Sequence, residues 1–417
     1  MDQFASRLKA SAGAEYQNIE SAVLLYSGGL ESRVVGSVLQ EWGLEVYPLV
    51  LDMGGREKRM AAVEKEAKVR FGRADMRSIV PDILSAARRG IKTNCLSYGY
   101  LNAGGFSRPF MAQAAAKFAA EKNISVVIHG HSGLSDDHLR FELSMRALAP
   151  QIRTLCPVRD WDMKREESRD YDKRQKGTQS FSAPSFSIDE NIWGRTAWQG
   201  DLLDPQARLP QTIGEWGGEK KRGGNESAKL TVAFANGTAE NVQVTNRTKK
   251  ETITGDEIVP YLNSLGASFG IGGRDIVVDK MMGPKTREYH QGPAAEILVA
   301  AHADLESICL TKKEQEMKSG IDRAWNKLVD EGGWFTRLRH QLDAFVDETQ
   351  NVVDGEVNLT LETGRLLVAG RSSPHALYDA RLGRSDSAGL LSSSSSRAYA
   401  RLRDLQETLA YRSGMEK

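Results

Sequence analysis

Short apolar runs alternate with amphipathic stretches through the first third of the chain. Residues 21–26 form an apolar run of strand length, and apolar residues at helical spacing follow it from 31 to 42. A second apolar run at 45–51 completes a β-α-β unit, which implies a right-handed crossover and a parallel sheet. Further helices and strands of the same pattern are expected at residues 56–71, 81–89, 110–121, 124–129, 138–148 and 152–156. Residues 1–20 form a polar lead-in to this unit.

A small-residue turn joins the first strand to the first helix. It reads Ser27-Gly-Gly-Leu-Glu-Ser32. Glycines let the backbone approach an anion closely, and the free N–H groups of a helix N-terminus donate to it. The turn lacks the Gly-Lys-Ser/Thr of a Walker loop and is too short for G-x-G-x-x-G. It is similar to the pyrophosphate loop of enzymes that cleave ATP to AMP, and the alternative is an ordinary glycine turn.

A second small-residue turn, Gly130 to Asp137, follows the strand at 124–129. Ligands of open α/β sheets bind outside the carboxyl ends of the strands, so both turns are candidate ligand contacts. Three histidines lie here, His129, His131 and His138, but no cysteine or carboxylate set completes a tetrahedral shell around them. We therefore expect His131 to be a pocket residue near the nucleotide and expect no histidine metal site.

The pattern changes after about residue 160. Hairpins are expected at 229–244, around Asn236-Gly237, and at 357–368, with long helices at 294–307 and 311–329 between them. This order is typical of an α+β domain. Three other features are a strand-like run at 275–278, a Gly- and Lys-rich surface excursion at 214–225 and a five-serine linker at 392–396. A terminal helix at 397–412 has one apolar face, which would dock on another subunit or on its own chain.

Composition narrows the class of protein. The chain has 417 residues, 40% of them hydrophobic and 27% charged, and a net charge of +1. This balance gives no electrostatic footprint for nucleic acid or a membrane surface, and no apolar run approaches the length of a membrane span. Three widely spaced cysteines and the lack of an apolar signal segment favour a reduced, cytoplasmic location.

Four stretches, taken together, resemble argininosuccinate synthase. They are colinear from about residue 21 to 380, and the match is weak at 56–99 and 205–230. The stretches are Ser27-Gly-Gly-Leu-Glu-Ser32; Arg108-Pro109 through His129-Gly130 to Arg140-Phe-Glu-Leu-Ser144 and Ala149-Pro-Gln-Ile152; Ser187-Ile-Asp-Glu-Asn-Ile-Trp-Gly194; and Gly370-Arg-Ser-Ser-Pro374 with Leu377-Tyr378.

The resemblance implies an ATP-dependent carbon–nitrogen ligase. In the family, ATP with Mg²⁺ adenylates the ureido oxygen of citrulline and releases pyrophosphate, and the amine of L-aspartate then displaces AMP. The implied fold is α/β, with a parallel-sheet nucleotide-binding domain at 17–177, an α+β synthetase domain at 178–380 and a C-terminal oligomerisation helix at 395–417 of a homotetramer. No covalent enzyme nucleophile is required, and the sequence offers no convincing nucleophilic arrangement.

Site residues follow from the matched positions. The resemblance places ATP against Tyr26, Ser27, Gly28, Gly29, Glu31, Ser32, Leu51, His129, Gly130 and Gly133. It places L-aspartate against Ser132, Asp136 and Asp137, and the acceptor against Tyr100, Gly105, Arg140, Ser187, Thr196, Val278 and His290. Arg140 and Asp137 are the candidate catalytic residues. Arg140 orients the acceptor oxygen through its fixed fork of donors, or else forms a structural ion pair with Glu142 or a neighbouring carboxylate.

The departures from the family concentrate on the acceptor. Gly105 replaces a serine, Asp136 an asparagine, Val278 a citrulline-binding glutamate and His290 a tyrosine, while the nucleotide loop carries Glu31 for Asp and Arg33 for a small hydroxyl residue. A register slip of one residue through 274–290 would change this assignment. The hypothesis is a ligase for a ureido, carbamoyl or carbonyl acceptor other than citrulline. The alternatives are a genuine argininosuccinate synthase and a non-catalytic nucleotide-binding homologue.

Overall fold

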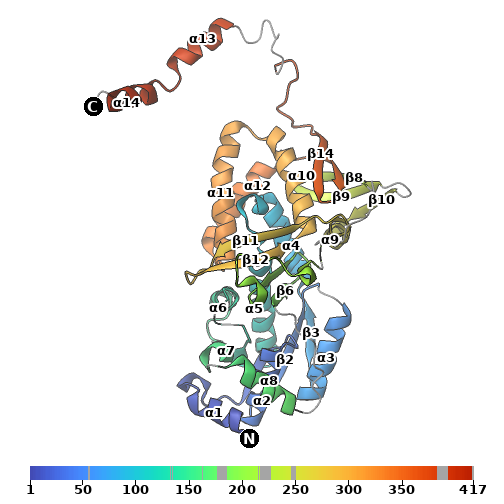
Figure 1. Cartoon of the computed structure of the whole chain (residues 1–417), viewed down its shortest axis with the longest axis vertical. Coiled ribbons are helices and arrows are strands. Elements are labelled where there is room, and N and C mark those ends of the chain that lie inside the picture. The colour runs from blue at the N-terminus through green and yellow to red at the C-terminus, as the bar shows by residue number, and fades with distance from the viewer. Residues whose placement is uncertain are drawn as a thin grey trace. The chain divides into compact units, whose positions relative to one another are not determined.

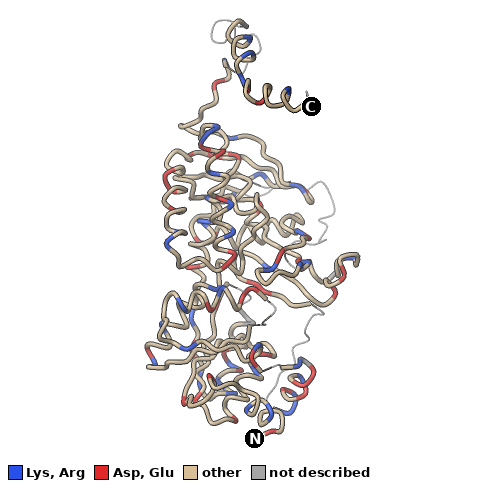
Figure 2. Tube along the Cα trace, turned by 90° about the vertical axis from the view of Figure 1, so that its left-hand side faces the viewer, with Lys and Arg blue, Asp and Glu red and all other residues tan. Residues whose placement is uncertain are grey.

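The computed structural model describes residues 1–54, 57–131, 133, 135–161, 163–175, 186–214, 216, 227–245, 250–382 and 393–415. Residues up to His375 form one compact unit, and residues from Ala376 onward form a second unit (Figure 1). Lys and Arg are interspersed with Asp and Glu along the trace (Figure 2). Within the described residues, no helix combines the length and the apolar character that crossing a membrane requires.

A five-stranded parallel sheet organises the N-terminal part of the first unit, which confirms the predicted α/β fold. The strand order is β3-β2-β1-β4-β5. The chain therefore runs outward from β1 to β3, then crosses back to β4 beside β1, so the topological switch point lies between β1 and β4. The strands are β1 (Ser21–Leu25), β2 (Glu45–Asp52), β3 (Asp75–Ser78), β4 (Val126–Ile128) and β5 (Arg153–Leu155).

Helices cover both faces of this sheet. The helices are α1 (Gln3–Ser11), α2 (Leu30–Glu41), α3 (Glu57–Phe71), α4 (Val80–Lys92), α5 (Ala103–Glu121), α6 (Asp137–Leu148), α7 (Pro157–Asp160) and α8 (Arg165–Arg174). The polar lead-in predicted for residues 1–20 is wrong, because Phe4 and Leu8 of α1 are buried and Asp2 caps the helix. Helix α5 also begins seven residues earlier than predicted and contains Pro109.

Two antiparallel sheets follow. One has the order β11-β12-β7-β6 and the other β10-β9-β8-β13-β14. The strands are β6 (Ser187–Glu190), β7 (Arg195–Trp198), β8 (Ala228–Ala235), β9 (Thr238–Thr245), β10 (Lys250–Thr254), β11 (Gly273–Asp279), β12 (Lys285–Gln291), β13 (Gly355–Glu362) and β14 (Arg365–Ser372). The helices are α9 (Ile258–Ser268), α10 (Pro293–Cys309), α11 (Lys312–Asp330) and α12 (Arg337–Gln350). Both predicted hairpins are present, as β8–β9 and β13–β14.

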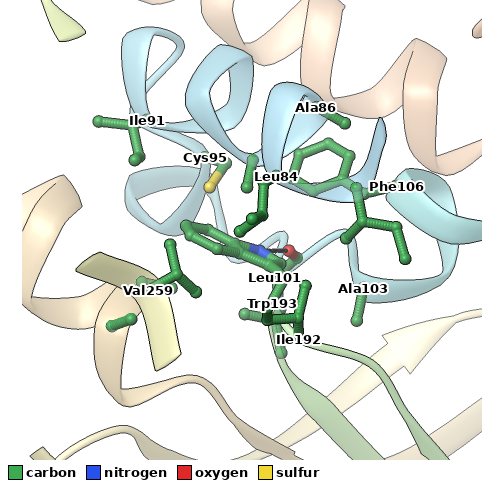
Figure 3. Close-up of a cluster of buried hydrophobic side chains, with 14 of the residues drawn as sticks. Leu84, Ala86, Ile91, Cys95, Leu101, Ala103, Phe106, Ile192, Trp193 and Val259 are labelled. Atoms are coloured by element: carbon green, nitrogen blue, oxygen red, sulfur yellow. Dashed lines mark hydrogen bonds between the residues drawn. The ribbon is translucent and has the colours of Figure 1, made fainter. Parts of the chain in front are cut away.

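One hydrophobic cluster runs from the parallel sheet into the antiparallel part of the first unit. Its centre is the fully buried Trp193, in the turn between β6 and β7 (Figure 3). The indole N–H donates to the carbonyl of Leu101 at 2.7 Å, and the ring lies beside Phe106 of α5. This anchor fixes the β6–β7 hairpin against the start of α5, which brings the antiparallel sheet to the carboxyl edge of the parallel one.

The second unit contains α13 (Ser393–Leu402) and α14 (Leu405–Met415). The single helix predicted at 397–412 is therefore wrong, because Asp404 adopts φ +53° and breaks it. Asp tolerates this left-handed conformation better than most residues. The serines at 393–396 belong to α13 and are not a linker. The excursion predicted at 214–225 lies outside the described residues, apart from positions 214 and 216.

Candidate functional site

The turn between β1 and α2 has the geometry of an anion-binding loop. Gly28 has φ +68°, a conformation that favours glycine, and Gly29 precedes the first helical residue. The hydroxyl of Ser27 accepts the N–H of Gly29 at 3.2 Å, and that of Ser32 donates to the Gly29 carbonyl at 3.0 Å. These bonds order the turn and leave the first N–H groups of α2 without helical acceptors. The matched Glu31 lies in this first helical turn.

Arg33 supports the loop from its buried side. Its Nη1 donates to the carbonyl of Gly28 at 2.8 Å, and its Nη2 pairs with Asp172 of α8 at 2.7 Å. Glu66 of α3 lies 3.8 Å from its Nε. The residue that departs from the family pattern is therefore a buried tether between the loop and two helices. The side chain of Tyr26 is buried against Phe71 and its backbone borders the loop, so its contact with ATP stays a prediction.

The carboxyl end of β4 meets the same helix N-terminus. A Cβ at Gly130 would lie 3.5 Å from the backbone nitrogen of Ser32, so glycine permits this close approach. The ring of His129 is fully buried, and its burial lowers its pKa. Its Nε2 lies 3.3 Å from Glu142, and Cys156 is close enough to complete a set of three metal-ligand types. The prediction of no histidine metal centre stays a prediction.

The remaining ATP candidates take two different positions. Leu51 lies near the end of β2 and is buried. Gly133 lies beside the stem of Arg159, which a Cβ at this glycine would meet at 2.9 Å. The structure thus brings both glycine turns to the switch-point edge of the parallel sheet. Ser132, matched to L-aspartate, lies outside the described residues.

Two arginines and three carboxylates form a connected group beside this edge. Arg108 of α5 lies between Asp137 of α6, at 2.8 Å, and Asp189 of β6, at 2.7 Å. Arg140 lies between Asp137, at 2.9 Å, and Asp330 at the end of α11, at 2.7 Å. Burial opposes the ionisation of Asp137, but the two guanidinium groups outweigh it and lower its pKa. The structural ion pair considered for Arg140 exists, with these carboxylates and not with Glu142.

One face of the sheet β11-β12-β7-β6 carries most of the acceptor candidates. Side chains that are paired directly across antiparallel strands share a face, as do alternate residues of each strand. The residues on this face are Ser187, Asp189, Thr196, Trp198, Arg274, Ile276, Val278, Thr286, Glu288 and His290. Asp189 joins the face to the arginine group, which places Ser187, Thr196, Val278 and His290 on the side of the sheet that meets α5.

A second ionic group connects this face to α6. Lys280, in the turn between β11 and β12, pairs with Glu288 and lies 4.0 Å from Asp136. Asp136 also accepts the backbone N–H of Met281 at 3.1 Å, and burial raises its pKa. His290 Nε2 lies 2.7 Å from Glu288. Asp136 is thus paired with a cation and a backbone N–H, and His290 is a partner of a carboxylate.

Two matched acceptor positions have different surroundings. Gly105 packs against α11, where an added Cβ would meet Val329 Cγ1 at 3.0 Å and its carbonyl oxygen at 3.1 Å. Gly104, which sequence reasoning missed, is the glycine that faces the Asp137–Arg140 pair, since a Cβ there would lie 2.8 Å from Asp137 Oδ1. Tyr100 is half-buried, and burial together with nearby Asp330 raises its pKa.

Comparisons with known proteins agree with this geometry. A model of the arginosuccinate synthase N-terminal HUP domain matches residues 21–178, and one of the arginosuccinate synthase C-terminal domain matches residues 186–410. The chain belongs to the argininosuccinate synthase family. It is therefore an AMP-forming carbon–nitrogen ligase by family, with an ATP-binding N-terminal domain.

Curated relatives match almost the whole chain. The argininosuccinate synthase of Pyrococcus furiosus is 33% identical over 394 residues, which cover 93% of this chain and 94% of the relative. That of Rubrobacter xylanophilus is 33% identical over 367 residues, 86% of this chain and 87% of the relative. That of Dehalococcoides mccartyi strain BAV1 is 31% identical, with 94% and 96% covered.

Sequence reasoning missed several residues of the ionic groups. They are Arg108, Asp189, Lys280, Glu288 and Asp330. Arg108 and Asp189 lie in stretches that carried the resemblance, and the charge of Arg108 inside a mostly apolar helix was an available signal. Lys280 and Asp330 gave no such signal, because a turn and a helix end are ordinary positions for charged residues.

Proposed function

We propose that this protein adenylates a ureido, carbamoyl or carbonyl oxygen of a small acceptor other than citrulline and couples that carbon to L-aspartate. The acceptor oxygen attacks the α-phosphorus of ATP and pyrophosphate leaves. The aspartate amine then attacks the activated carbon, loses a proton and displaces AMP. This chemistry needs a site that binds pyrophosphate and places two substrates against it.

The single observation that carries the proposal is the common face shared by the acceptor candidates. Val278 and His290 lie on the same face as Ser187 and Thr196. A register slip of one residue would exchange Val278 for Val277, which is on the opposite face and 60% exposed. The shared face therefore supports the assignment of Val278 to the position of the family's glutamate. Valine cannot replace a charge-assisted contact to an amino group, which is worth about 1.5–3 kcal/mol.

The nucleotide roles in this proposal use the loop residues. Ser27, Gly28, Gly29 and Ser32 hold the pyrophosphate, and the backbones of Leu51, Gly130 and Gly133 border the nucleotide. Mg²⁺ usually takes one or two carboxylates together with phosphate oxygens. Glu31 fits this need, because it is in the first turn of α2 and its Oε2 lies 3.7 Å from where a Cβ of Gly29 would stand. Bound Mg²⁺ would offset the charge of the leaving pyrophosphate.

The substrate roles use the ionic groups. Asp137 is fixed by Arg108 and Arg140, so its carboxylate is held ready to accept the ammonium of L-aspartate, with Ser132 and Asp136 as further contacts. Arg140 presents its remaining N–H groups to the acceptor oxygen. We further propose that the apolar residues exposed on α13 and α14, such as Leu402 and Leu409, contact other subunits of a homotetramer.

A genuine argininosuccinate synthase is the second candidate. The observation in its favour is that relatives with this name match nearly the whole chain at about a third identity. The retained loop, Asp137 and Arg140 count against a non-catalytic homologue, because that class would not need a paired and buried catalytic group.

Pyrophosphate release with ATP, Mg²⁺ and L-aspartate, with and without citrulline, tests the proposal. We expect ATP to bind in a parallel titration and citrulline to add little release. The variant Val278→Glu with His290→Tyr should gain citrulline-dependent release, while the matched control Val277→Glu, on the opposite face, should not. Strong release by the unaltered protein with citrulline would establish the second candidate. Failure to bind ATP would exclude both ligases and leave a non-catalytic homologue.

A further inference from the structure

Charge around the acceptor side of the site is not balanced. Arg108 and Arg140 share three carboxylates, those of Asp137, Asp189 and Asp330. Each guanidinium carries one positive charge, so this group has a net charge of −1 when all its members are ionised. The group is largely buried, where such a charge is weakly screened.

The neighbouring ionic group adds to this surplus. Lys280 is the ammonium between two carboxylates, those of Glu288 and Asp136. His290 contacts Glu288 and carries a charge only when protonated. With neutral His290, the two groups together place five carboxylates against three cations, counted over the described residues.

Asp330 is the carboxylate of this set that a ligand can reach. Its side chain is 30% exposed, compared with 11% for Asp137 and 6% for Asp136. Its Oδ1 accepts from Arg140 Nη2, and its Oδ2 accepts no hydrogen bond from the described residues. The charge of Asp330 also helps to raise the pKa of Asp136, a candidate contact of L-aspartate, and that of Tyr100, a candidate contact of the acceptor. Asp330 is therefore close enough to both residues for its charge to act on them.

Helix α11 is fixed in this position by close packing. A Cβ at Gly332, just beyond the helix, would lie 3.0 Å from the Cα of Arg140, and Arg140 Nε donates to the Asp330 carbonyl at 2.5 Å. The end of α11 is thus attached to α6 by both backbone and side chain. Asp330 cannot turn away from the site without breaking these contacts.

We propose that the acceptor carries a cationic group, such as an ammonium or amidinium, and that Asp330 is the residue that selects it. This inference rests on the proposed ligase function and names its substrate class. A cationic acceptor offsets the surplus of carboxylates and the charge of the co-substrate L-aspartate, whereas an acceptor with a free carboxylate adds to both. Because desolvated charges of like sign repel strongly, the sign of the acceptor becomes a specificity filter.

Three ureido compounds that share a 4-ureidobutyl chain test this inference. Citrulline is a zwitterion, (4-aminobutyl)urea lacks its carboxylate and is a cation, and 5-ureidopentanoate lacks its ammonium and is an anion. Pyrophosphate release is measured with ATP, Mg²⁺ and L-aspartate. We expect kcat/KM for the cation to exceed that for the anion by about tenfold or more, the selectivity of one charge-assisted contact.

Variants in α11 test whether the charge selectivity comes from Asp330. Asp330→Asn keeps an acceptor for Arg140 and removes the charge, so it should lower the cation-to-anion ratio about tenfold, and Asp330→Glu should restore it. Glu316→Gln is the matched control, because this exposed carboxylate of the same helix pairs with Lys312 at 3.7 Å, and its removal should change the ratio by less than about twofold.

Different results would overturn the inference and the proposed function. The first case is release of pyrophosphate with these acceptors at a cation-to-anion ratio that is equal, reversed or unaffected by Asp330→Asn. That result overturns the charge filter and leaves the ligase function intact. If none of the three supports release, their affinities are compared with a non-hydrolysable ATP analogue and L-aspartate present. Preferential binding of the cation, lost in Asp330→Asn, then supports the filter, and equal binding overturns it. A higher kcat/KM with citrulline than with both other compounds contradicts the proposal that the acceptor is not citrulline.

Discussion

The nucleotide loop and the acceptor face of this protein are built in different ways. The loop is formed by one contiguous stretch, residues 26–33, and by the ends of neighbouring parallel strands. The acceptor face takes its side chains from two hairpins, β6–β7 and β11–β12, that are far apart in the chain. In the proposed function, the loop binds through backbone N–H groups, whereas the face binds through side chains.

This difference explains where the chain departs from its family. Backbone donors are the same for most residue types, so the loop can carry Glu31 and Arg33 and keep its geometry. A substitution on the face, such as Val278, changes the chemistry offered to a ligand directly. The comparison predicts that changes near the loop act mainly on stability and that changes near the face act on acceptor choice.

The largest effect is expected at Arg33. Arg33→Met leaves the Gly28 carbonyl without its donor and leaves Asp172 with only the more distant Arg70, at 3.6 Å. Loss of one member of a buried ion pair costs about 3–5 kcal/mol. We expect the free energy of unfolding, measured by urea denaturation, to fall by about that amount and ATP affinity to fall with it.

An exposed ion pair serves as the control, because it shows the effect of removing an arginine that is not buried. Arg7 pairs with Glu167, and both side chains are at least a third exposed, so Arg7→Met should cost less than about 1 kcal/mol. The double variant Arg33→Met with Asp172→Leu should recover part of the loss, because it removes the uncompensated carboxylate. Equal effects of Arg33→Met and Arg7→Met would contradict the role of Arg33 as a tether.

An intermediate effect is expected at Gly105. Restoring the family's serine with Gly105→Ser brings a Cβ within 3.0 Å of Val329 Cγ1. Overpacking of this kind costs about 1–3 kcal/mol, so we expect a lower melting temperature and no gain of citrulline turnover. Gly320→Ser is the control, since Gly320 is also inside a helix and has no neighbour within 4 Å of an added Cβ. Undiminished stability together with citrulline turnover would show that Gly105 borders the acceptor after all.

The same contrast shows what the sequence could predict. The parallel sheet and the glycine loop follow from periodicity and from a local strand–turn–helix pattern, and both are confirmed. The short edge strand β3 was missed because three of its four residues, Asp75–Ser78, are polar and none of the four is fully buried. Helix α1 was missed because only three buried residues mark its apolar face.

The ionic groups could not be predicted from local pattern. Arg140 meets Asp330 across 190 residues of sequence, and Arg108 meets Asp189 across 81. Such contacts depend on how α11 and the antiparallel sheet pack against α5 and α6, which no local spacing encodes. The resemblance identified Arg140 and Asp137, but their pairing with Asp330 and Arg108 is visible only in three dimensions.

The smallest effect is expected at Asp136. Burial raises the pKa of Asp136 above its ordinary 3.8. A carboxyl with a higher pKa in the folded state contributes stability that is present below the unfolded pKa and is lost as pH rises through the folded pKa. Asp136→Asn removes this dependence and keeps an acceptor for the Met281 N–H. The free energy of unfolding of the variant should therefore increase relative to that of the unaltered protein as pH rises from about 4 to neutrality. The increase should be about 1 kcal/mol or less, because Lys280 partly offsets the charge of Asp136.

Urea denaturation at several pH values measures this gain. Asp279→Asn is the control, because Asp279 pairs with Lys285 in an exposed position and its removal should leave the pH profile parallel to that of the unaltered protein. A difference between Asp136→Asn and the unaltered protein that does not change with pH would mean that the carboxyl is fully compensated by Lys280. Asp136 would then add no uncompensated charge of its own, and the charge selection proposed for the acceptor side would rest on Asp330.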